Sequence, residues 1–200
     1  DARTGKILKS IDTGTTILAA PMTYKVKGVQ YIAVMAAWGG GGYPYVPRYA
    51  AAYQRGNAGR LLVFKLDGGA VPIPPELPPL AVAPEPPRQA PGVTPETIAQ
   101  GRGLFFANCA ICHANQHRSI TPDLRRMQPG THDAFKAIVL DGALVPNGMP
   151  RWNDVLTPAE ADAVHAYLID LQAATRRDEL AKVKAGLPLD APSLAILSNY

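Results

Sequence analysis

The two cysteines of the chain, Cys109 and Cys112, lie three residues apart, and His113 directly follows the second. In a helical turn, side chains at positions i, i+3 and i+4 lie on the same side, so these three residues face one object. The spacing C-x-x-C-H is the signature for covalent attachment of c-type haem, in which both sulfurs form thioethers with the vinyl groups and the imidazole binds the iron. The sequence therefore predicts a haem c site here.

Closely spaced thiols have two other common uses. A redox dithiol is expected beside a βαβ pattern, which the neighbouring sequence does not show. A zinc site would need two further ligands at a suitable spacing. A disulfide between cysteines so close together would close almost no loop. We therefore favour haem attachment over these alternatives.

An iron held by one histidine has a sixth coordination position, and several downstream residues could fill it. The candidates are Met127, Met149, His117, His132 and His165. A methionine thioether favours ferrous iron and raises the reduction potential, as in electron-transferring cytochromes. We predict Met149, because Gly148 and Pro150 impose an irregular backbone that can present its sulfur. Met127 is expected to fill a core, and the three histidines are expected on polar surface.

Several neighbours of the motif are expected to support it. The carbonyl of Pro122 is a candidate acceptor for the ring N–H of His113, since an iron-bound imidazole needs such a partner to fix its tautomer. Four aromatic residues should pack around the porphyrin and between helices: Phe105, Phe106, Trp152 and Tyr167. Four arginines could balance haem propionates or attract an acidic partner, but a solvated face is the simpler expectation for them: Arg118, Arg125, Arg126 and Arg151.

Two predicted helices flank this site. The segment 94–96 supplies a Thr N-cap, a first-position Pro and an acidic residue, so a helix should begin there and run into the cysteine motif. A second should begin at Thr157, which has capping-box spacing to Glu160. Its apolar residues step by three, four and three along one face: Ala161, Val164, Leu168 and Leu171. We expect this helix to end near Ala174.

The first 70 residues have the composition of β-structure. Three runs rich in Val, Ile, Tyr and Leu, bounded by turn residues, are predicted strands: 15–22, 29–36 and 60–66. Lys27-Gly28 and Asp67-Gly68 are predicted turns. Residues 38–49 contain four consecutive glycines and should form a loop. Three strands are too few to bury both faces of a sheet, so the region is expected to be an incomplete piece.

Half of the 20 prolines fall between Pro72 and Pro95. Prolines at this density favour polyproline II, with a reach of roughly 3.1 Å per residue, so residues 71–93 are predicted to be a semi-rigid linker. It separates the β-region, 1–70, from a helical domain, 94–174. The mixed, charged segment 175–200 is expected to be a surface tail.

The composition excludes other classes. The formal net charge is +4, but the basic residues are scattered and no basic run interleaves with aromatics, so nucleic-acid binding is not expected. No apolar run approaches the ~18 residues of a membrane span. The opening "DARTGKILK" lacks the apolar core of a signal peptide.

Residues 94–174 resemble class I cytochrome c domains, through "CAICH", "TPDL", "NGMP" and the closing "TPAEADAVHAYL". The resemblance implies a small all-α fold in which the first and last helices cross, with Gly103 and Phe106 facing Tyr167. The loop after His113 lacks the glycines common in that family.

The first 70 residues resemble the last blade of the eight-bladed propeller of pyrroloquinoline quinone (PQQ) dependent alcohol dehydrogenases, through "DARTGKIL", "QYIAVMAAWGGGGYP" and "GRLLVFKLDGG". Lys9 departs from the repeat, which usually has tryptophan there. Blade, proline-rich linker and cytochrome, in this order, are the arrangement of quinohaemoprotein alcohol dehydrogenases. The implied fold class is mixed: a short β segment that ends a propeller, then an all-α class I cytochrome c domain. Trp38 and Gly39 are implied PQQ contacts.

The resemblance implies electron transfer by covalently bound haem c, which accepts electrons from PQQ in a periplasmic enzyme that oxidises alcohols to aldehydes or ketones. Its implied partners are the rest of the propeller and an external acceptor: a soluble cytochrome, a copper protein or a membrane quinone system. The family's catalytic aspartate and calcium ligands belong to earlier blades, so this chain alone is not expected to oxidise alcohols. Two alternatives stay open: a free-standing periplasmic electron carrier, and a haem sensor or peroxidase with an open sixth position.

Overall fold

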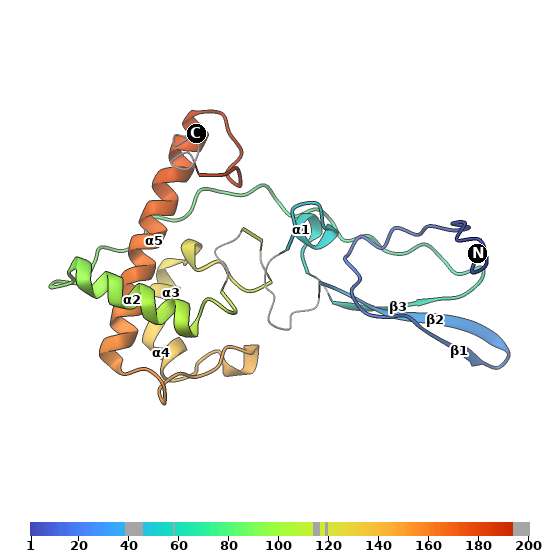
Figure 1. The fold of residues 1–200 in the computed structure, drawn as a ribbon, viewed down its shortest axis with the longest axis horizontal. Helices are drawn as coiled ribbons and strands as arrows, with labels where there is room; N and C mark the ends of the chain where they lie inside the picture. Colours follow the sequence, from blue (N-terminus) through green and yellow to red (C-terminus); the bar gives the residue numbers. More distant parts are fainter. Residues whose placement is uncertain (39–45, 58, 114–116, 119, 194–200) are drawn as a thin grey trace. The chain divides into compact units, whose positions relative to one another are not determined.

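The computed structural model of the chain describes residues 1–38, 46–57, 59–113, 117–118 and 120–193. The chain forms two compact units (Figure 1). The first consists of Asp1–Pro78 with Arg118–Ile120, and the second of Pro79–His117 with Thr121–Tyr200. No helix among the described residues has the length and apolar character needed to cross a bilayer.

The first unit contains an antiparallel sheet in the order β1-β2-β3, and one short helix. Its elements are β1 (Met22–Val26), β2 (Val29–Ala36), α1 (Ala51–Arg55) and β3 (Arg60–Phe64). Lys27 and Gly28 join β1 to β2 with φ of 49° and 82°. Positive φ at both residues is the requirement of a type I′ hairpin turn, which matches the right-handed twist of the strands. The predicted turn is confirmed.

The first predicted strand, 15–22, is wrong. Apart from the last residue, this run forms only an isolated bridge between Ile17 and Ala37, and β1 begins at Met22. The tight turn fixes the register of β1 against β2, so the residues that pair are those just before the turn, whatever their hydrophobicity. The predicted strands 29–36 and 60–66 are confirmed within two residues at each end.

Many apolar side chains of this sheet remain exposed. Those on the strands are Met22, Tyr24, Val26, Val29, Ile32, Met35, Leu61 and Val63. Three strands with one short helix do not cover both sheet faces, as expected for an incomplete piece.

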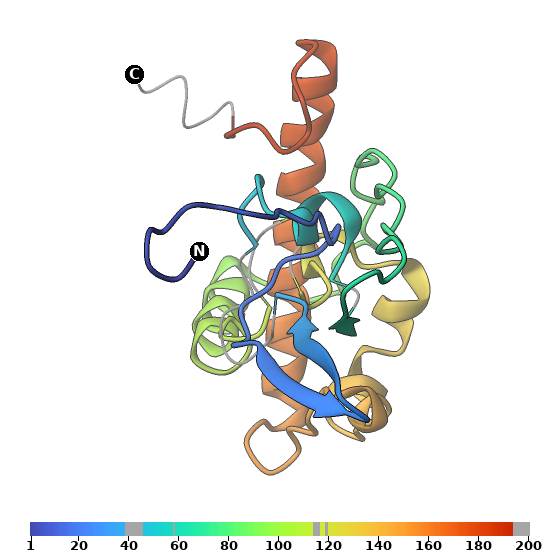
Figure 2. The same cartoon turned by 90° about the vertical axis from the view of Figure 1, so that its right-hand side faces the viewer.

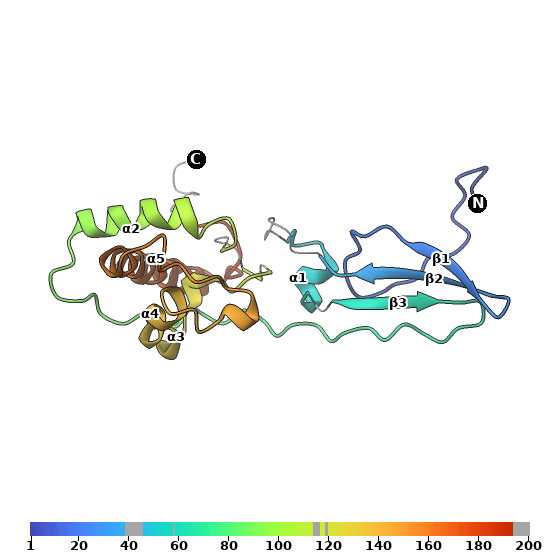
Figure 3. The same ribbon diagram turned by 90° about the horizontal axis from the view of Figure 1, so that it is seen from below.

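The second unit is helical. Its elements are α2 (Pro95–Asn108), η1 (Leu124–Arg126), α3 (Pro129–Asp133), α4 (Phe135–Val139), η2 (Val145–Asn147) and α5 (Pro158–Lys184). Both predicted helix starts are confirmed, since Thr94 and Thr157 each form a capping box with the residue three positions later. In Figure 3, α5 runs between α2 on one side and α3 and α4 on the other.

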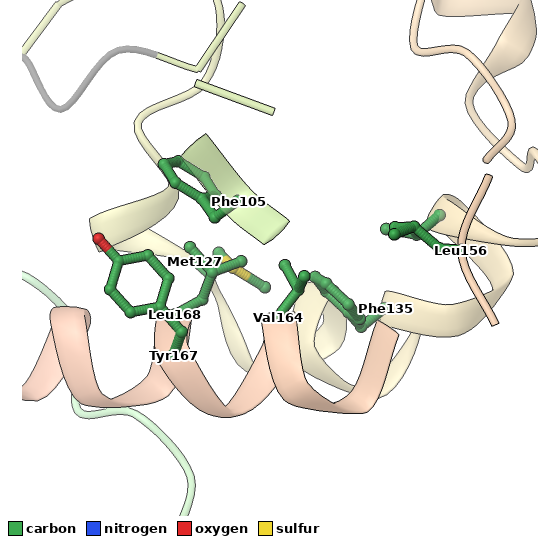
Figure 4. Close-up of a cluster of buried hydrophobic side chains, with 8 residues drawn as sticks. Phe105, Met127, Phe135, Leu156, Val164, Tyr167 and Leu168 are labelled. Carbon is green, nitrogen blue, oxygen red and sulfur yellow. The ribbon is translucent and has the colours of Figure 1, made fainter. Parts of the chain in front are cut away.

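The core of this unit lies between α5 and the elements around it (Figure 4). Its buried side chains are Phe105, Met127, Phe135, Val139, Leu156, Val164, Tyr167 and Leu168. The backbones of α2 and α5 approach closely at Gly101, where an added Cβ would lie 1.8 Å from the carbonyl oxygen of Ala163. Phe105 packs on Tyr167, with ring centroids 5.4 Å apart.

The implied contact of Gly103 and Phe106 with Tyr167 is therefore wrong. Nothing lies within 4 Å of a Cβ built on Gly103, and Phe106 is 52% exposed. The face of α2 that meets α5 carries Gly101 and Phe105, which are spaced by one helical turn. Gly101 with Phe105 and Gly103 with Phe106 are each a glycine followed by an aromatic residue within about one helical turn. Only the packing against α5 shows which pair faces that helix.

The predicted end of the last helix, near Ala174, is also wrong. Figure 2 shows α5 as one continuous helix whose C-terminal turns extend beyond α2, and it ends at Lys184. Two charged residues of this extension are buried, Glu179 and Lys182. The ammonium of Lys182 contacts Asp178 Oδ2 at 2.7 Å and donates to the carbonyl of Ala191 at 2.7 Å. Residues 175–184 of the expected surface tail therefore belong to α5, and Leu189 and Ala191 bond back to it through Lys182.

The second half of the proline-rich segment packs within the second unit. Ala83 is buried, its N–H donates to Glu179, and its carbonyl accepts from Arg176. The carbonyl of Pro84 accepts from the amide of Gln172 at 3.0 Å. We call residues 79–84 the strap. Its extended backbone matches the expectation for a proline-rich segment, but it is bound to α5 and is not a free spacer.

Candidate haem-binding site

The cysteine motif forms one tight turn at the end of α2. Cys109 is the C-cap of the helix, and its carbonyl accepts the backbone N–H groups of Cys112 at 3.1 Å and His113 at 2.9 Å. Cys109 and His113 are half-buried, and Cys112 is exposed. The three reactive side chains thus leave the backbone from a single turn, as the spacing predicts.

The thiol of Cys109 lies in a low-polarity setting. Burial raises its pKa to about 11, and the neighbouring Cys112 contributes in the same direction. Without haem this group therefore remains a protonated thiol at neutral pH. Addition of such an S–H across a vinyl group gives a thioether, with the hydrogen taken up by the second vinyl carbon.

The imidazole of His113 is held by the segment that follows the motif. Its Nδ1 lies 3.0 Å from the carbonyl oxygen of Pro122. Since a carbonyl can only accept, Nδ1 carries the hydrogen and Nε2 presents its lone pair. The hydroxyl of Thr121 donates to the carbonyl of Cys112, which ties the same segment to the motif. The predicted hydrogen bond between His113 and the Pro122 carbonyl is confirmed.

The surroundings suit a large, flat, mostly apolar group with polar edges. Two apolar side chains next to the motif in sequence are exposed, those of Phe106 and Ile111. The indole N–H of Trp152 is buried and has no hydrogen-bond partner among the described residues. Such a group is costly unless a ligand atom accepts from it. These residues fit haem c.

The two candidate methionines lie in different settings. Met127 is 4% exposed within the core cluster, as expected for a gap-filler. Met149 is half-buried and follows Gly148, whose φ is 90°. Its N–H donates to the carbonyl of Leu144 at 3.2 Å, so a compact loop holds this residue. Met127 is therefore enclosed by the core, whereas Met149 lies in a loop outside it.

The expected surface position of His132 is wrong, because this residue is 5% exposed. Its Nε2 lies 3.1 Å from Gln172 Oε1, and its Nδ1 lies 2.9 Å from His165 Nε2. The amide nitrogen of Gln172 donates to the carbonyls of Pro84 and Met127, each at 3.0 Å. Gln172 supplies the hydrogen bond that the buried His132 imidazole needs. The periodicity of apolar residues in the sequence does not reveal this pairing.

These bonds determine the tautomers of the pair. The amide nitrogen of Gln172 faces two acceptors, so its oxygen must accept from His132 Nε2–H. His132 Nδ1 then has a free lone pair and accepts from His165 Nε2–H. Burial, and then His132, lower the pKa of His165 to about 4, and burial is also the main cause of the lowered pKa of His132. Both rings are neutral at pH 7.

Three of the four expected solvated arginines are bound instead. Arg125 makes two 2.8 Å bonds to Asp123, and Arg126 pairs with Glu179. Arg118 donates to carbonyl oxygens of the first unit, those of Tyr53 at 3.2 Å and Pro78 at 2.6 Å. Arg151 is exposed, as expected.

Trp38 lies in the first unit, half-buried against the cluster of Val46, Ala50, Ala52 and Tyr53. Its backbone N–H donates to Asn57 Oδ1 at 2.7 Å. Gly39 lies outside the described residues.

Comparison with known proteins decides the relationship. A profile of the family described as cytochrome C oxidase, cbb3-type, subunit III matches residues 96–168. The chain is 36% identical over 186 residues to quinohemoprotein alcohol dehydrogenase ADH IIB of Pseudomonas putida, which covers 90% of this chain and 26% of that protein. The chain is a relative of the quinohaemoprotein alcohol dehydrogenases, with a cytochrome c domain. The chain spans about a quarter of the length of its curated relatives.

Other similar proteins agree. Lupanine 17-hydroxylase [cytochrome c] of a Pseudomonas species is 37% identical over 174 residues, with coverage of 84% of this chain and 24% of that protein. The structure of ADHIIG from Pseudomonas putida HK5 superposes with a TM-score of 0.62 at 31% identity, over 82% of this chain and 24% of that one. The Comamonas testosteroni quinohemoprotein alcohol dehydrogenase gives 0.57 at 26%, over 81% and 23%.

The match over 96–168 confirms the cytochrome c domain, its haem c and its role in electron transfer. Sequence reasoning missed the polar residues that α5 directs at the strap. Gln172, Arg176 and Glu179 are spaced by four and three residues, which continues the helical period of the apolar face. The helical spacing of these three residues could have indicated a buried face, but polar residues at such positions are usually assigned to the solvent side of a helix.

Proposed function

We propose that this chain works within a quinohaemoprotein alcohol dehydrogenase. In the proposed reaction an alcohol is oxidised to an aldehyde or ketone, PQQ takes the two electrons, and haem c accepts them one at a time. The observation that carries the proposal is the C-x-x-C-H turn with its Pro122-held imidazole, in a chain that aligns along nine-tenths of its length with such an enzyme. Alcohol oxidation and PQQ belong to the proposal, because the chain spans only a quarter of that enzyme.

We assign the haem-binding roles to five residues. Cys109 and Cys112 would form the thioethers, and His113 Nε2 would bind the iron from one side. Met149 would supply the sixth ligand, since the other nearby methionine, Met127, is in the core. The bound haem supplies a one-electron carrier whose potential a thioether ligand raises. The chain's own part is to fix the imidazole, to exclude water with apolar side chains, and to offer Trp152 N–H to a propionate.

The first unit is assigned as the last blade of the eight-bladed propeller. Its three antiparallel strands leave apolar side chains exposed on the sheet, and partner blades would cover them. Trp38 and Gly39 would then approach the PQQ, while calcium and the catalytic aspartate would be held by other blades. Residues 1–70 would form the blade, 71–93 the connection and 94–174 the cytochrome c domain, which the extended α5 carries further.

The cellular setting follows the same assignment. The proposed location is the periplasm, and the proposed first partner is the rest of the propeller. A soluble cytochrome, a copper protein or a membrane quinone system would then accept the electrons. The proposed acceptors agree with words in the names of two relatives: 1-butanol dehydrogenase (cytochrome c) of Thauera butanivorans and alcohol dehydrogenase (quinone), dehydrogenase subunit, of Acetobacter aceti.

The ligand assignment is tested by Met149→Ala in the haem-loaded protein. We expect the reduction potential to fall, by part of the roughly 0.8 V range over which axial ligands set haem potentials, and the ferrous form to bind carbon monoxide readily. The matched control is Met127→Leu, a volume-conserving core change that should leave the potential unchanged. If Met149→Ala leaves the potential and the carbon monoxide affinity unchanged, the assignment is wrong.

The parent activity is tested with the full-length enzyme. Addition of a primary alcohol should reduce the haem when PQQ and calcium are bound, and should not when PQQ is withheld. Haem reduction that is independent of PQQ would overturn the proposed electron path.

A further inference from the structure

A buried carboxylate on α5 connects the strap to the haem-binding segment. Glu179 is 1% exposed. Its Oε2 accepts the backbone N–H of Ala83 at 2.6 Å, and its Oε1 accepts from Arg126 Nη2. A carboxylate buried this deeply is tolerated only when both oxygens are paired, so the positions of its partners are constrained.

Arg126, the last residue of η1, extends this network toward the haem motif. Besides Glu179, its guanidinium donates to the carbonyl of Ala81 and, through Nε, to His117 Nδ1 at 3.3 Å. His117 is neutral, because burial and the adjacent Arg125 and Arg126 lower its pKa to about 4. The guanidinium thus joins the strap, α5 and η1.

The other end of η1 carries the residue beside Pro122. Asp123 caps this short helix, with its Oδ1 accepting the N–H of Arg125 at 3.1 Å, and its Oδ2 lies 3.8 Å from Arg126 Nε. The preceding carbonyl, that of Pro122, accepts from His113 Nδ1. Any displacement of η1 therefore moves the carbonyl that orients the imidazole.

We propose that Glu179 is a positioning residue for His113, acting through Arg126 and Asp123 on the carbonyl of Pro122. The inference rests on the proposed role of His113 as an iron ligand. A hydrogen bond from Nδ1 to a well-placed carbonyl makes the imidazole a stronger donor and stabilises ferric iron. Glu179 thereby lowers the reduction potential from the far end of α5.

The first test is Glu179→Gln in the haem-loaded chain, compared with Glu160→Gln. Glu160 lies at the opposite end of the same helix, where it is a half-buried residue of the capping box. We expect the potential to rise in Glu179→Gln and to stay unchanged in Glu160→Gln. The His113 ring N–H should exchange with water up to about tenfold faster in Glu179→Gln by NMR, the factor that corresponds to loss of one net hydrogen bond.

Loss of a negative charge would by itself also raise the potential, so a second variant separates charge from position. The double change Glu179→Gln with Arg126→Gln preserves the net charge, leaves no buried unpaired ion and is therefore expected to fold. Positioning predicts that the potential again rises and ring N–H exchange again accelerates. If the double variant has the reduction potential of the wild type, the rise in Glu179→Gln is explained by the lost charge alone, and the proposal is overturned.

The two proposals fail differently. If His113 does not bind iron, the wild-type haem protein will lack the spectrum of a histidine-ligated haem, and the proposed function fails. If that spectrum is present but ring exchange is unchanged in Glu179→Gln, only the role of Glu179 is refuted.

Discussion

At the scale of single residues, the side chains that decide the chemistry are fixed by one or two hydrogen bonds each. The carbonyl of Pro122 fixes the tautomer of His113, and the amide of Gln172 fixes that of His132. In both cases a group that can only donate or only accept removes the ambiguity of the imidazole ring. In the His132–His165 pair, His132 is buried and His165 is half-buried, and burial lowers the pKa of both rings, which keeps them neutral at pH 7.

Stability should depend on pH through these buried rings. The pKa of His165 is about 4 in the folded protein against about 6.5 for an unperturbed histidine, so the unfolded chain binds more protons between these values. The free energy of unfolding of the haem-loaded protein is therefore expected to be fully developed above pH 6.5 and to fall as the pH drops toward 4. Denaturant titrations at pH 7, 6 and 5 would measure this slope.

The variant His165→Gln should flatten that slope. The reduction is expected to be smaller than the ~1.4 kcal/mol per pH unit of one fully shifted proton, because solvent reaches the half-buried ring. Most carboxylates stay ionised between pH 6.5 and 5, so the comparison belongs in that range. A slope identical to that of the wild type would show that the pair does not control acid stability.

At the scale of elements, the crossing of α2 and α5 depends on which glycine faces the partner helix. Gly101 allows the α2 backbone to approach the carbonyl of Ala163, and Phe105, one turn later, fills the space beside Tyr167. Gly103 faces open space. The same residue type thus has a packing role at one position and a destabilising flexibility at the other.

The pair of glycines gives a matched test. Gly101→Ala would place a Cβ 1.8 Å from the Ala163 carbonyl oxygen, so the helices must separate, and we expect a loss of about 3 kcal/mol or failure to fold. Gly103→Ala should raise the stability by about 0.5–1 kcal/mol, because alanine loses less backbone entropy in a helix. Urea unfolding of the haem-loaded variants measures both. Equal effects of the two changes would contradict this helix crossing.

At the scale of the whole molecule, the chain consists of two units of different completeness. The helical unit has a buried core and two helices that begin with capping boxes. Its strap supplies hydrogen-bond partners to buried polar groups of α5. The β unit leaves a row of strand side chains exposed. The helical unit therefore has what a chain needs to fold alone, and the β unit needs a partner surface.

A truncation series tests the strap at this scale. A haem-loaded fragment 79–200 should unfold cooperatively and be more stable than the fragment 94–200, which lacks the strap. Without residues 79–84, Glu179, Arg176 and Gln172 each lose a partner, at about 1 kcal/mol for each net hydrogen bond. Thermal unfolding followed by haem absorbance would compare the fragments. The same melting temperature for both would show that the strap contributes nothing to the helical unit.

The sequence by itself determined the features written within a few consecutive residues. These are the C-x-x-C-H turn, the helix starts at Thr94 and Thr157, and the Lys27-Gly28 hairpin turn. Each depends on hydrogen bonds or backbone angles that the residues of one turn satisfy among themselves. Local chemistry therefore sufficed to predict haem attachment and the helix that presents it.

The tertiary structure alone decided the features that need a partner distant in sequence. Gly101 rather than Gly103 meets α5, His132 is buried because Gln172 satisfies it, and α5 continues past Ala174 beneath the strap. A glycine, a histidine or a charged helical turn has the same local preference whether it faces solvent or another segment. Its environment is set by long-range packing, in which a buried polar group is stable only when another part of the chain supplies the matching donor or acceptor.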